Sequence, residues 1–371
     1  MPKKYRAAVI GHTGKGNYGH GLDRVWLDLP EVEVVAVSDP SEKGLAGAKQ
    51  RLSIEQGFRD YHQMLQEVKP DLVSICPRWL DQHHDMLVAC VEAGVRGVYC
   101  EKPLCQTLTQ ADNMEQLARE ANMKVAVAHQ TRYSPILPVV KELIDSGRIG
   151  EPLEFRGRGK EDHRGGGEDL WVLGTHVFNL IQHLGGEAVW CFARAFSEGD
   201  PVSAEHVAPG NEGIGLLAAT EVHATYGLSQ GATAFFDSVR HKGQSPTRFG
   251  LMIHGSEGII AMNTGYLPTA SWLPDGSWTP ARTGKEWIKI SSAGPGKPEP
   301  LTDGGLAAGN ILACQDLIRA MEDDREPESS LREAKLSVEM IVGVFASHVN
   351  KRPVELPLKD RDNPLGRLLE Q

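Results

Sequence analysis

An acid, a base and a proline follow a short apolar run in the stretch GVYCEKPL, residues 97–104. The apolar run is typical of a buried strand, and Glu101, Lys102 and Pro103 come directly after its end. In a parallel sheet, ligands bind beyond the carboxyl ends of the strands. This position predicts that Lys102 lies beside a ligand, whereas an isolated triplet of this kind would indicate only a surface ion pair before a loop proline.

A glycine-rich stretch follows the first strand-like run of the chain. Gly14, Gly16 and Gly19 fit the pattern G-x-G-x-x-G, and Gly11 could take the role of the first glycine in a longer loop. Such glycines let backbone N–H groups approach a pyrophosphate, and a helix expected over GLDRVWLDL, residues 21–29, would add its N-terminal dipole. The stretch predicts a dinucleotide site, with a glycine-rich turn that binds nothing as the alternative.

An aspartate ends the second strand-like run, 20 residues after Gly19. This is the spacing of the acid that accepts hydrogen bonds from the adenosine ribose. A carboxylate at Asp39 would repel a 2′-phosphate, which favours NAD over NADP. His12, Lys15 and His20 lie in the same glycine-rich loop, and we interpret them as solvated side chains.

The first 130 residues alternate short strand-like runs with helical patterns. The runs are rich in Val and Ile, which is typical of strands that are buried on both faces. They comprise residues 5–10, 32–37, 71–76, 97–100 and 124–128. This alternation predicts βαβ units and a parallel sheet.

The pattern changes after Tyr133, where one amphipathic helix is followed by long β-rich stretches and then by two helical patterns near the end. Such an order is typical of a mostly antiparallel sheet with helices on one side. We therefore predict an α/β protein with a Rossmann domain over residues 1–130 and a second α/β domain over residues 131–371.

Composition and charge exclude several classes of protein. The 371 residues carry a net charge of -10, which argues against binding to nucleic acid or to anionic membranes. The six cysteines form no C-x-x-C pair, and no Cys/His spacing resembles a zinc site, so no metal is expected. Scattered thiols, no hydrophobic signal region and no membrane-length apolar run predict a cytoplasmic protein.

Several motifs occur together and in a fixed order. They are VIGHTGKGNYGHG, VAVSDP, VYCEKPL, HQTRYSPILPVVKELIDSGRIGEP and GGGEDLWVLGTHVFNLIQHLGG. With these motifs the chain resembles the Gfo/Idh/MocA family of NAD(P)-dependent sugar and polyol oxidoreductases over nearly its whole length. The resemblance implies a Rossmann domain and an α/β domain with a large open sheet. It also implies a carbohydrate or polyol substrate and a homodimer or homotetramer formed through the outer face of that sheet.

The resemblance implies roles for individual residues. Lys102 would bind the reacting sugar oxygen beside the nicotinamide, Glu101 would hold the lysine and the cofactor, and Pro103 would fix the turn through a cis bond. His176, in the motif LGTH, would take the hydroxyl proton as hydride leaves for the nicotinamide. Further expected contacts are Pro77, His83 and Gln130 with the cofactor, and Arg132, Trp171 and His163 with the substrate, a core role being as plausible for Trp171.

One position departs from the family pattern. Family dehydrogenases with a lysine, aspartate and histidine set place the aspartate four residues before the histidine, where this chain has Val172. Asp169, Glu168 or His163 could supply the acid, and we take Asp169 as the candidate. Alternatively His176 could act alone or relay to water, or ordinary alcohol dehydrogenation could be absent.

Three functions remain open at this point. The first is an NAD-dependent dehydrogenase that transfers hydride between a ring carbinol carbon of a sugar, glycoside or cyclic polyol and the nicotinamide. The second is a hydrolase or lyase that uses tightly held NAD in a transient oxidation–elimination cycle to cleave glycosidic bonds. The third is a non-catalytic regulator that binds NAD, and the presence of both Lys102 and His176 weighs against it.

Overall fold

The computed structural model describes residues 4–370, which form two compact units. The first unit contains the chain as far as Gln130 together with residues 211–215 and 306–335, and the second contains residues 131–210, 216–305 and those from 336 onward. Helix α9 (Leu306–Asp323) belongs to the first unit, although the predicted domains place it in the second.

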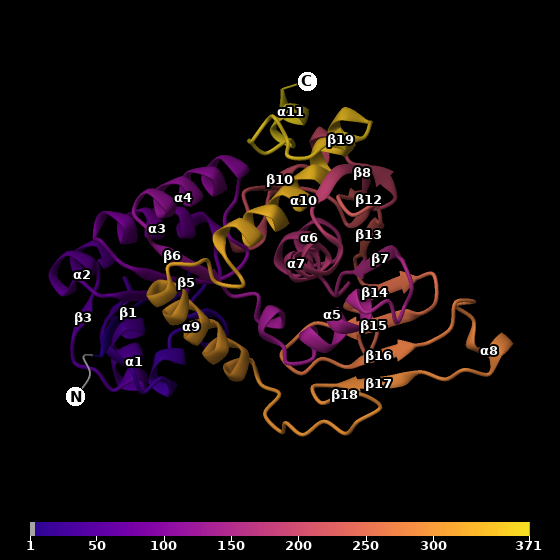
Figure 1. Cartoon of the computed structure of the whole chain (residues 1–371). Helices are drawn as coiled ribbons and strands as arrows, with labels where there is room; N and C mark the ends of the chain where they lie inside the picture. The colour runs from indigo at the N-terminus through magenta and orange to yellow at the C-terminus, as the bar shows by residue number, and fades with distance from the viewer. Residues whose placement is uncertain (1–3, 371) are drawn as a thin grey trace. The chain divides into compact units, whose positions relative to one another are not determined.

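A parallel sheet of six strands forms the centre of the first unit (Figure 1). Its strand order is β3-β2-β1-β4-β5-β6, the Rossmann order, in which the chain reverses direction across the sheet between β1 and β4. The strands are β1 (Tyr5–Ile10), β2 (Val32–Ser38), β3 (Gly57–Phe58), β4 (Leu72–Ile75), β5 (Gly97–Cys100) and β6 (Lys124–Val127). The predicted parallel sheet is confirmed.

Helices cover both faces of this sheet because its strands are apolar on both sides. Every residue of β4, β5 and β6 is buried. Helices α2, α3 and α4 pack side by side on one face, and α9 packs against β5 and β6 on the other. The helices besides α9 are α1 (Glu42–Leu52), α2 (Tyr61–Val68), α3 (His83–Glu92) and α4 (Leu108–Glu120).

The helix predicted over residues 21–29 is wrong. Two short 3₁₀ turns occupy this segment, η1 (Gly19–Gly21) and η2 (Val25–Asp28). Trp26 turns its indole inward and donates to the Ser74 hydroxyl at 2.7 Å, and that hydroxyl donates to the Leu22 carbonyl at 2.9 Å. These buried bonds to β4 fix the segment through tertiary contacts that override its apolar periodicity.

An eleven-stranded sheet forms the second unit, and all its neighbouring strands are antiparallel except β7 and β13. Its order is β18-β17-β16-β15-β14-β7-β13-β12-β8-β19, with β9 paired to β8. The strands are β7 (Pro152–Arg158), β8 (Ala188–Ser197), β9 (Asp200–Pro201), β12 (Glu221–Leu228), β13 (Thr233–Val239), β14 (Gly250–Gly255), β15 (Ile259–Asn263), β16 (Ala270–Leu273), β17 (Ile288–Ser291), β18 (Gly294–Pro295) and β19 (Val354–Glu355). A separate pair joins β10 (Ala208–Pro209) and β11 (Leu216–Leu217).

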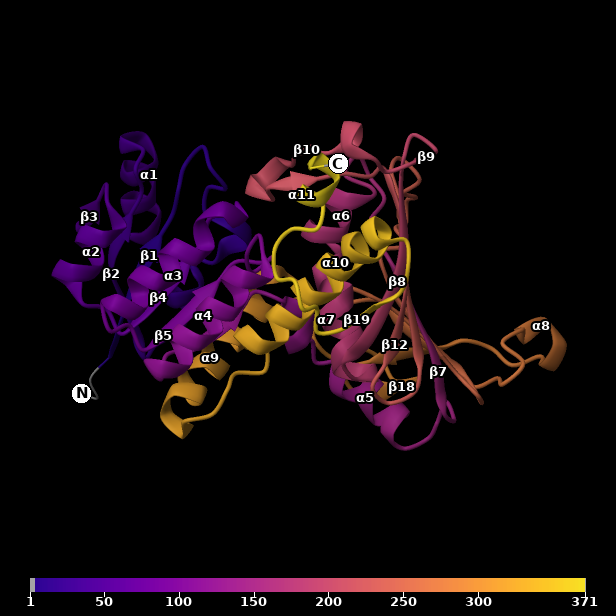
Figure 2. The same ribbon diagram turned by 90° about the horizontal axis from the view of Figure 1, so that it is seen from above.

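The longer helices of the second unit lie on one face of this sheet, and the short α8 projects on the other side. Figure 2 shows the sheet nearly edge-on, with α6, α7 and α10 on the same side. Phe178 of α7 packs edge-on against Tyr226 and lies 4.8 Å from Phe236, measured between ring centres, so the inner face is aromatic. The helices are α5 (Leu137–Asp145), α6 (Gly167–Val172), α7 (Gly174–Gly185), α8 (Pro280–Thr283), α10 (Leu331–Asn350) and α11 (Gly366–Leu369).

Two further observations concern the described residues as a whole. Within residues 4–370, no helix combines the length and the apolar character that a membrane crossing needs. In the same part of the chain no group of His, Cys, Asp and Glu side chains is arranged to hold a metal ion. The six cysteines are buried as free thiols.

Candidate active site

The acid and base that follow β5 lie inside the first unit rather than on its surface. Glu101 is fully buried, and Lys102 is 4% exposed. Oε2 of Glu101 accepts from the backbone N–H of Lys102 at 2.8 Å, and the bond from Lys102 to Pro103 is cis. The alternative of a surface ion pair is therefore wrong, because the carboxylate turns inward and holds the main chain of the lysine.

His83 ties this turn to the end of the neighbouring strand. Its Nε2 lies 2.6 Å from the Pro77 carbonyl, and its Nδ1 lies 3.0 Å from the carbonyl oxygens of Pro103 and Leu104. The ring is fully buried, so His83 supports the two loops after β4 and β5 instead of presenting a nitrogen to a cofactor. The predicted cofactor contact of His83 is thus replaced by a supporting role, while Pro77 stays a predicted contact.

The glycine-rich loop folds as a small hairpin, residues 12–17, before the two 3₁₀ turns. His12 and Asn17 exchange backbone hydrogen bonds of 3.2 and 2.9 Å across it. Gly14, with a φ of +90°, has open space where a Cβ would lie, whereas a Cβ on Gly16 would lie 2.4 Å from the Arg78 nitrogen. A 3₁₀ turn rather than an α-helix follows directly, so the helix dipole expected from the sequence is missing. The N–H groups of Thr13, Gly14 and Lys15 donate to Asp39, to the Asn17 side chain and to the His12 carbonyl.

The hairpin covers the aspartate at the end of β2. Asp39 is fully buried. Its oxygens accept from the Thr13 hydroxyl at 2.7 Å, from the Thr13 N–H at 3.1 and 3.2 Å, and from the Ser41 N–H at 2.9 Å. A ribose could bond to Asp39 only after Thr13 moves, so the predicted ribose contact of Asp39 does not exist in this arrangement.

The opposite side of the hairpin is fastened to the loop after β4. The Arg78 N–H donates to the Gly16 carbonyl at 3.2 Å, and the Gln82 amide donates to the Lys15 carbonyl at 3.2 Å. The His12 ring also contacts the Gln82 side chain, so His12 is not simply solvated. The hairpin thus spans from the end of β2 to the end of β4 over the end of β1, which is the edge where dinucleotides bind in this fold.

The fit of NAD to these residues depends on that hairpin. A cavity of about 260 Å³ lies beside it and is lined by Gly11, Pro40, Arg59 and neighbouring residues, next to the predicted adenosine end. The strand order, the open Gly14 and the buried Glu101 and Lys102 suit a dinucleotide with its nicotinamide toward β5. These residues fit NAD once Thr13 has released Asp39.

Asn310 and His20 belong to the same site but were not found from the sequence. The Asn310 amide donates to the His20 carbonyl at 2.9 Å and accepts from the Tyr99 hydroxyl at 2.8 Å and from Gln130 at 3.2 Å. The His20 ring contacts Glu101, which corrects its interpretation as solvated. The buried Gln130 therefore supports the loop through Asn310, and no local pattern links residues so far apart in the chain.

The predicted histidine of the second unit lies in the first turn of α7. His176 is half-buried, and its N–H donates to the Leu173 carbonyl at 3.1 Å. Val172, at the position of the family aspartate, is 5% exposed and ends α6. Trp171 is 1% exposed, which matches the core role left open for it, and its indole N–H has no hydrogen-bond partner among residues 4–370.

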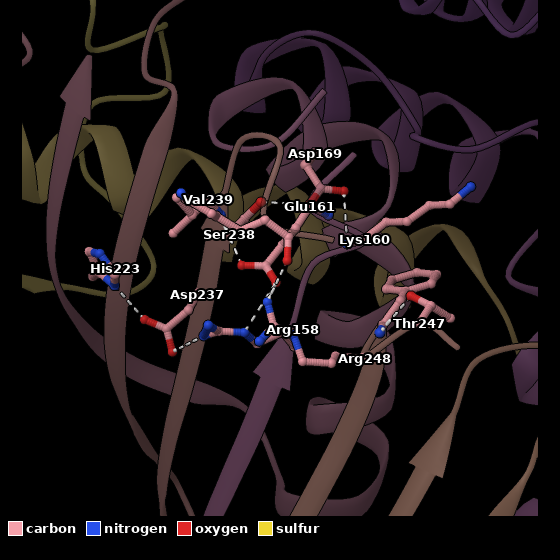
Figure 3. A network of polar contacts seen from close by, with 12 residues as sticks. Arg158, Lys160, Glu161, Asp169, His223, Asp237, Ser238, Val239, Thr247 and Arg248 are labelled. Carbon is pink, nitrogen blue, oxygen red and sulfur yellow. Dashed lines mark hydrogen bonds and ion pairs between the residues drawn. The ribbon is translucent and has the colours of Figure 1, made fainter. Parts of the chain in front are cut away.

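Asp169 has a structural role in this unit (Figure 3). Its carboxylate accepts from the N–H groups of Lys160 and Glu161 at 3.2 and 3.0 Å and from the Ser238 hydroxyl at 2.6 Å. Burial raises the pKa of this carboxyl above its ordinary value, although the bond from Ser238 and the backbone bonds oppose the shift. Asp169 therefore joins the loop before α6 to β13, which does not support the catalytic role predicted for it.

The remaining predicted residues are spread over the same unit. Glu168 is 9% exposed in α6, and Arg132 is half-buried in the turn η4 (Gln130–Tyr133). The His163 side chain is 77% exposed next to Asp162. The substrate contacts of Arg132 and His163 stay predictions, as does Glu168 as a source of the missing acid. The exposure of His163 makes it the weakest of the three candidates for that acid.

Comparison with known proteins identifies the family. A family model described as "Oxidoreductase family, NAD-binding Rossmann fold" matches residues 5–129, and one described as "Oxidoreductase family, C-terminal alpha/beta domain" matches residues 141–356. The chain belongs to the Gfo/Idh/MocA family.

Characterised relatives in this Gfo/Idh/MocA family act on sugars and cyclic polyols, as their names state. Myo-inositol 2-dehydrogenase of Thermotoga maritima is 26% identical over 207 residues, covering 53% of this chain and 60% of the relative. Levoglucosan dehydrogenase of Pseudarthrobacter phenanthrenivorans is 26% identical over 260 residues, covering 63% and 65%. The chain thus spans about half to two thirds of the length of these relatives.

Solved structures of the Gfo/Idh/MocA fold match almost the entire chain. A levoglucosan dehydrogenase in complex with NADH and levoglucosan has a TM-score of 0.78 at 20% identity, covering 96% of this chain and 100% of that one. An oxidoreductase of Agrobacterium radiobacter, in complex with NAD+, L-tartaric acid and magnesium, has a TM-score of 0.71 at 19% identity, covering 95% and 98%. At these identities the likeness shows the fold.

The bond between Thr13 and Asp39 predicts how NADH binding responds to a change at the hairpin. Thr13→Val keeps the shape of the side chain but removes the hydroxyl that donates to Asp39. Because a bond to a charged group is worth about 1.5–3 kcal/mol and binding requires it to break, we expect NADH affinity to rise about tenfold or more. Fluorescence titration with NADH measures this, and Thr109→Val on α4 is the control. Weaker binding to Thr13→Val would mean that the hydroxyl contacts the cofactor itself.

Proposed function

We propose that this protein is an NAD-dependent dehydrogenase of a sugar, glycoside or cyclic polyol. The observation that carries the proposal is the placement of Lys102 after β5, with its main chain held by the buried Glu101 at the dinucleotide edge of a Rossmann sheet. The inositol and levoglucosan dehydrogenases among the relatives support this class of substrate. NAD, when bound, supplies the acceptor for the hydride of the carbinol carbon.

The residues of the chain would prepare and hold the substrate hydroxyl. The Lys102 ammonium group would donate to the oxygen of the reacting carbinol and stabilise negative charge on it as its proton leaves. His176 would accept that proton at a ring nitrogen, as a general base. Lys102 belongs to the first unit and His176 to the second.

Replacement of Lys102 and His176 tests this division of roles. Because proton transfer by a positioned side chain contributes about 10²–10⁴-fold, we expect Lys102→Met and His176→Asn each to lower kcat by about that factor. Turnover is followed as NADH formation with a panel of inositols, sugars and glycosides. The control variants are Lys43→Met and His62→Asn, two exposed residues on α1 and α2. Full turnover by Lys102→Met would contradict the mechanism.

A second function is favoured by the side chains before His176. Val172 is apolar and buried. The Asp169 carboxylate already accepts hydrogen bonds from the backbone and from Ser238. Neither residue therefore offers the carboxylate of the family dehydrogenases. An NAD-dependent oxidation–elimination cycle on a glycoside is therefore the alternative. It is recognised in the same assay by mass spectrometry, because cleaved glycoside would form while no NADH accumulates.

The outer face of the large sheet supports the proposal of a homodimer or homotetramer. In Figure 2, α6, α7 and α10 lie on the other side of the sheet, and the short α8, between β16 and β17, projects on this side. Trp190 and Phe192 of β8 and Met252 of β14 are 37–41% exposed, which is typical of an interaction surface. A cavity of about 480 Å³ on this face is lined by residues that include Phe235, Arg158 and Arg248.

A network of ion pairs orders the same face (Figure 3). Asp237 accepts from His223 at 2.5 Å and lies 3.4 Å from the Arg158 guanidinium, while Arg248 donates to Glu161 at 2.7 Å. Burial lowers the pKa of His223, but its bonds to Glu221 and Asp237 outweigh burial and leave the pKa raised. Because every charge in this network has a partner of opposite sign, the face can be covered by a second copy without leaving a lone buried charge.

A charge placed on this face should separate the subunits. Phe192→Glu puts a carboxylate among exposed apolar side chains, where burial against a second copy would cost several kcal/mol. We expect sedimentation to show a dimer or tetramer for the parent protein and monomers for this variant. Leu369→Glu, on α11 and 52% exposed, is the control. A parent protein that sediments as a monomer would contradict the proposed assembly.

A further inference from the structure

The buried carboxylate of Glu101 needs partners, because an ionised group without them is costly inside a protein. Each carboxylate oxygen of Glu101 has its own partner. Oε2 accepts from the N–H of Lys102 at 2.8 Å, and Oε1 contacts Nδ1 of His20. Burial raises the pKa of Glu101, but the bond and charge of His20 and the charge and N–H of Lys102 outweigh burial, so the pKa is lowered. Glu101 is thus ionised at neutral pH, and it joins the glycine-rich loop to the lysine.

The backbone of the loop is fixed directly against this carboxylate. A Cβ on Gly19, whose φ is +35°, would lie 2.4 Å from Oε1 of Glu101 and 2.6 Å from the Cys76 carbonyl. The absence of a side chain there lets the loop lie flat on Glu101. Asn310 holds the next residue by donating to the His20 carbonyl at 2.9 Å. The position of His20 is therefore fixed by the packing of Gly19 on Glu101 and by the hydrogen bond from Asn310.

We propose that His20 is a positioning residue for Lys102 and acts through Glu101. By keeping the carboxylate ionised and in place, His20 maintains the bond that orients the main chain of Lys102 relative to the loop that receives the cofactor phosphates. The inference rests on the proposed function in one respect, namely that Lys102 contacts the substrate.

The groups that face Glu101 come from several segments of the first unit. From the glycine-rich loop the facing group is His20, and from the turn after β5 it is Lys102. Cys76 at the end of β4 and Cys100 of β5 also lie near, and burial raises the pKa of both thiols well above their ordinary value, so they stay neutral. Arg24 and Asp28 line a cavity of about 250 Å³ together with His20.

Two substitutions of His20 distinguish its hydrogen bond to Glu101 from the packing of its side chain. His20→Leu removes the donor, so the buried Glu101 keeps only Lys102. His20→Gln keeps a side-chain N–H donor but cannot carry a charge. Because misplacement of a reacting group by about 1 Å can cost about 10²-fold, we expect His20→Leu to lower kcat by roughly that factor and to change KM for NAD less. His20→Gln should retain most of the turnover.

The pH dependence of thermal stability provides a measurement that needs neither substrate nor cofactor. In the parent protein the lowered pKa of Glu101 means that its contribution to stability is complete above the ordinary value of 4.5 and is lost only as the pH falls through the lowered pKa. In His20→Leu, His20 no longer opposes the effect of burial on Glu101, so the pKa of Glu101 rises. At low pH, protonation of Glu101 then removes the buried charge. We expect Tm to fall by several degrees at pH 8 and by less at pH 5.

The controls decide whether the effect passes through Glu101. His12→Leu alters the same loop, but the His12 ring contacts the Gln82 amide rather than Glu101, so its effect on Tm should not depend on pH in this way. Combining His20→Leu with Glu101→Gln should abolish the extra pH dependence, because a neutral amide has no proton to take up. Equal, pH-independent shifts for His20→Leu and His12→Leu would overturn the proposal. If the parent protein fails to bind NADH, the proposed function falls, while the Tm profiles still decide the coupling of His20 to Glu101.

Discussion

The pairing of β4 with β5 places one buried carboxylate where three segments of the first unit meet. Ile75 and Cys100 are partners in this parallel ladder, so the residues that follow both strands leave the sheet at the same level. Glu101 contacts the main chain of Lys102 and the ring of His20, and it lies under Gly19. An unpaired carboxylate at this depth would be strongly unfavourable, so the ionised state of Glu101 depends on its contacts with Lys102 and His20.

The architecture could be predicted from the sequence because its signals are local. The Val- and Ile-rich runs predict β1, β4, β5 and β6 within a residue or two, and the same pattern indicates a sheet covered on both faces. The helix predicted over residues 21–29 failed for a reason that is not local. Trp26 is buried against Ser74, a residue far along the chain, and this bond replaces the helical geometry that its neighbours would favour alone.

In the candidate site too, features set by local sequence were predicted and those set by long-range contacts were missed. The positions of Glu101 and Lys102 after a buried strand predicted their place at the sheet edge, and the cis bond before Pro103 is confirmed. The partners of Asp39 and Glu101 were missed, because Thr13 and His20 reach them by folding of an unusually long loop. Asp169 shows the opposite error: its spacing from His176 suggests chemistry, yet its bonds to Ser238 and to the backbone show that it braces a loop.

The closed hairpin of residues 12–17 separates two properties of cofactor binding that are usually adjusted together. The affinity measured for a ligand equals its intrinsic affinity reduced by the fraction of molecules whose site is open. Here that fraction depends on Thr13 and on the bonds of Lys15 and Gly16 to the loop after β4, while other residues would hold the nicotinamide end. Substitutions in the hairpin therefore change the NAD concentration that saturates the site and the rate of NAD binding, without altering any group that carries out the reaction.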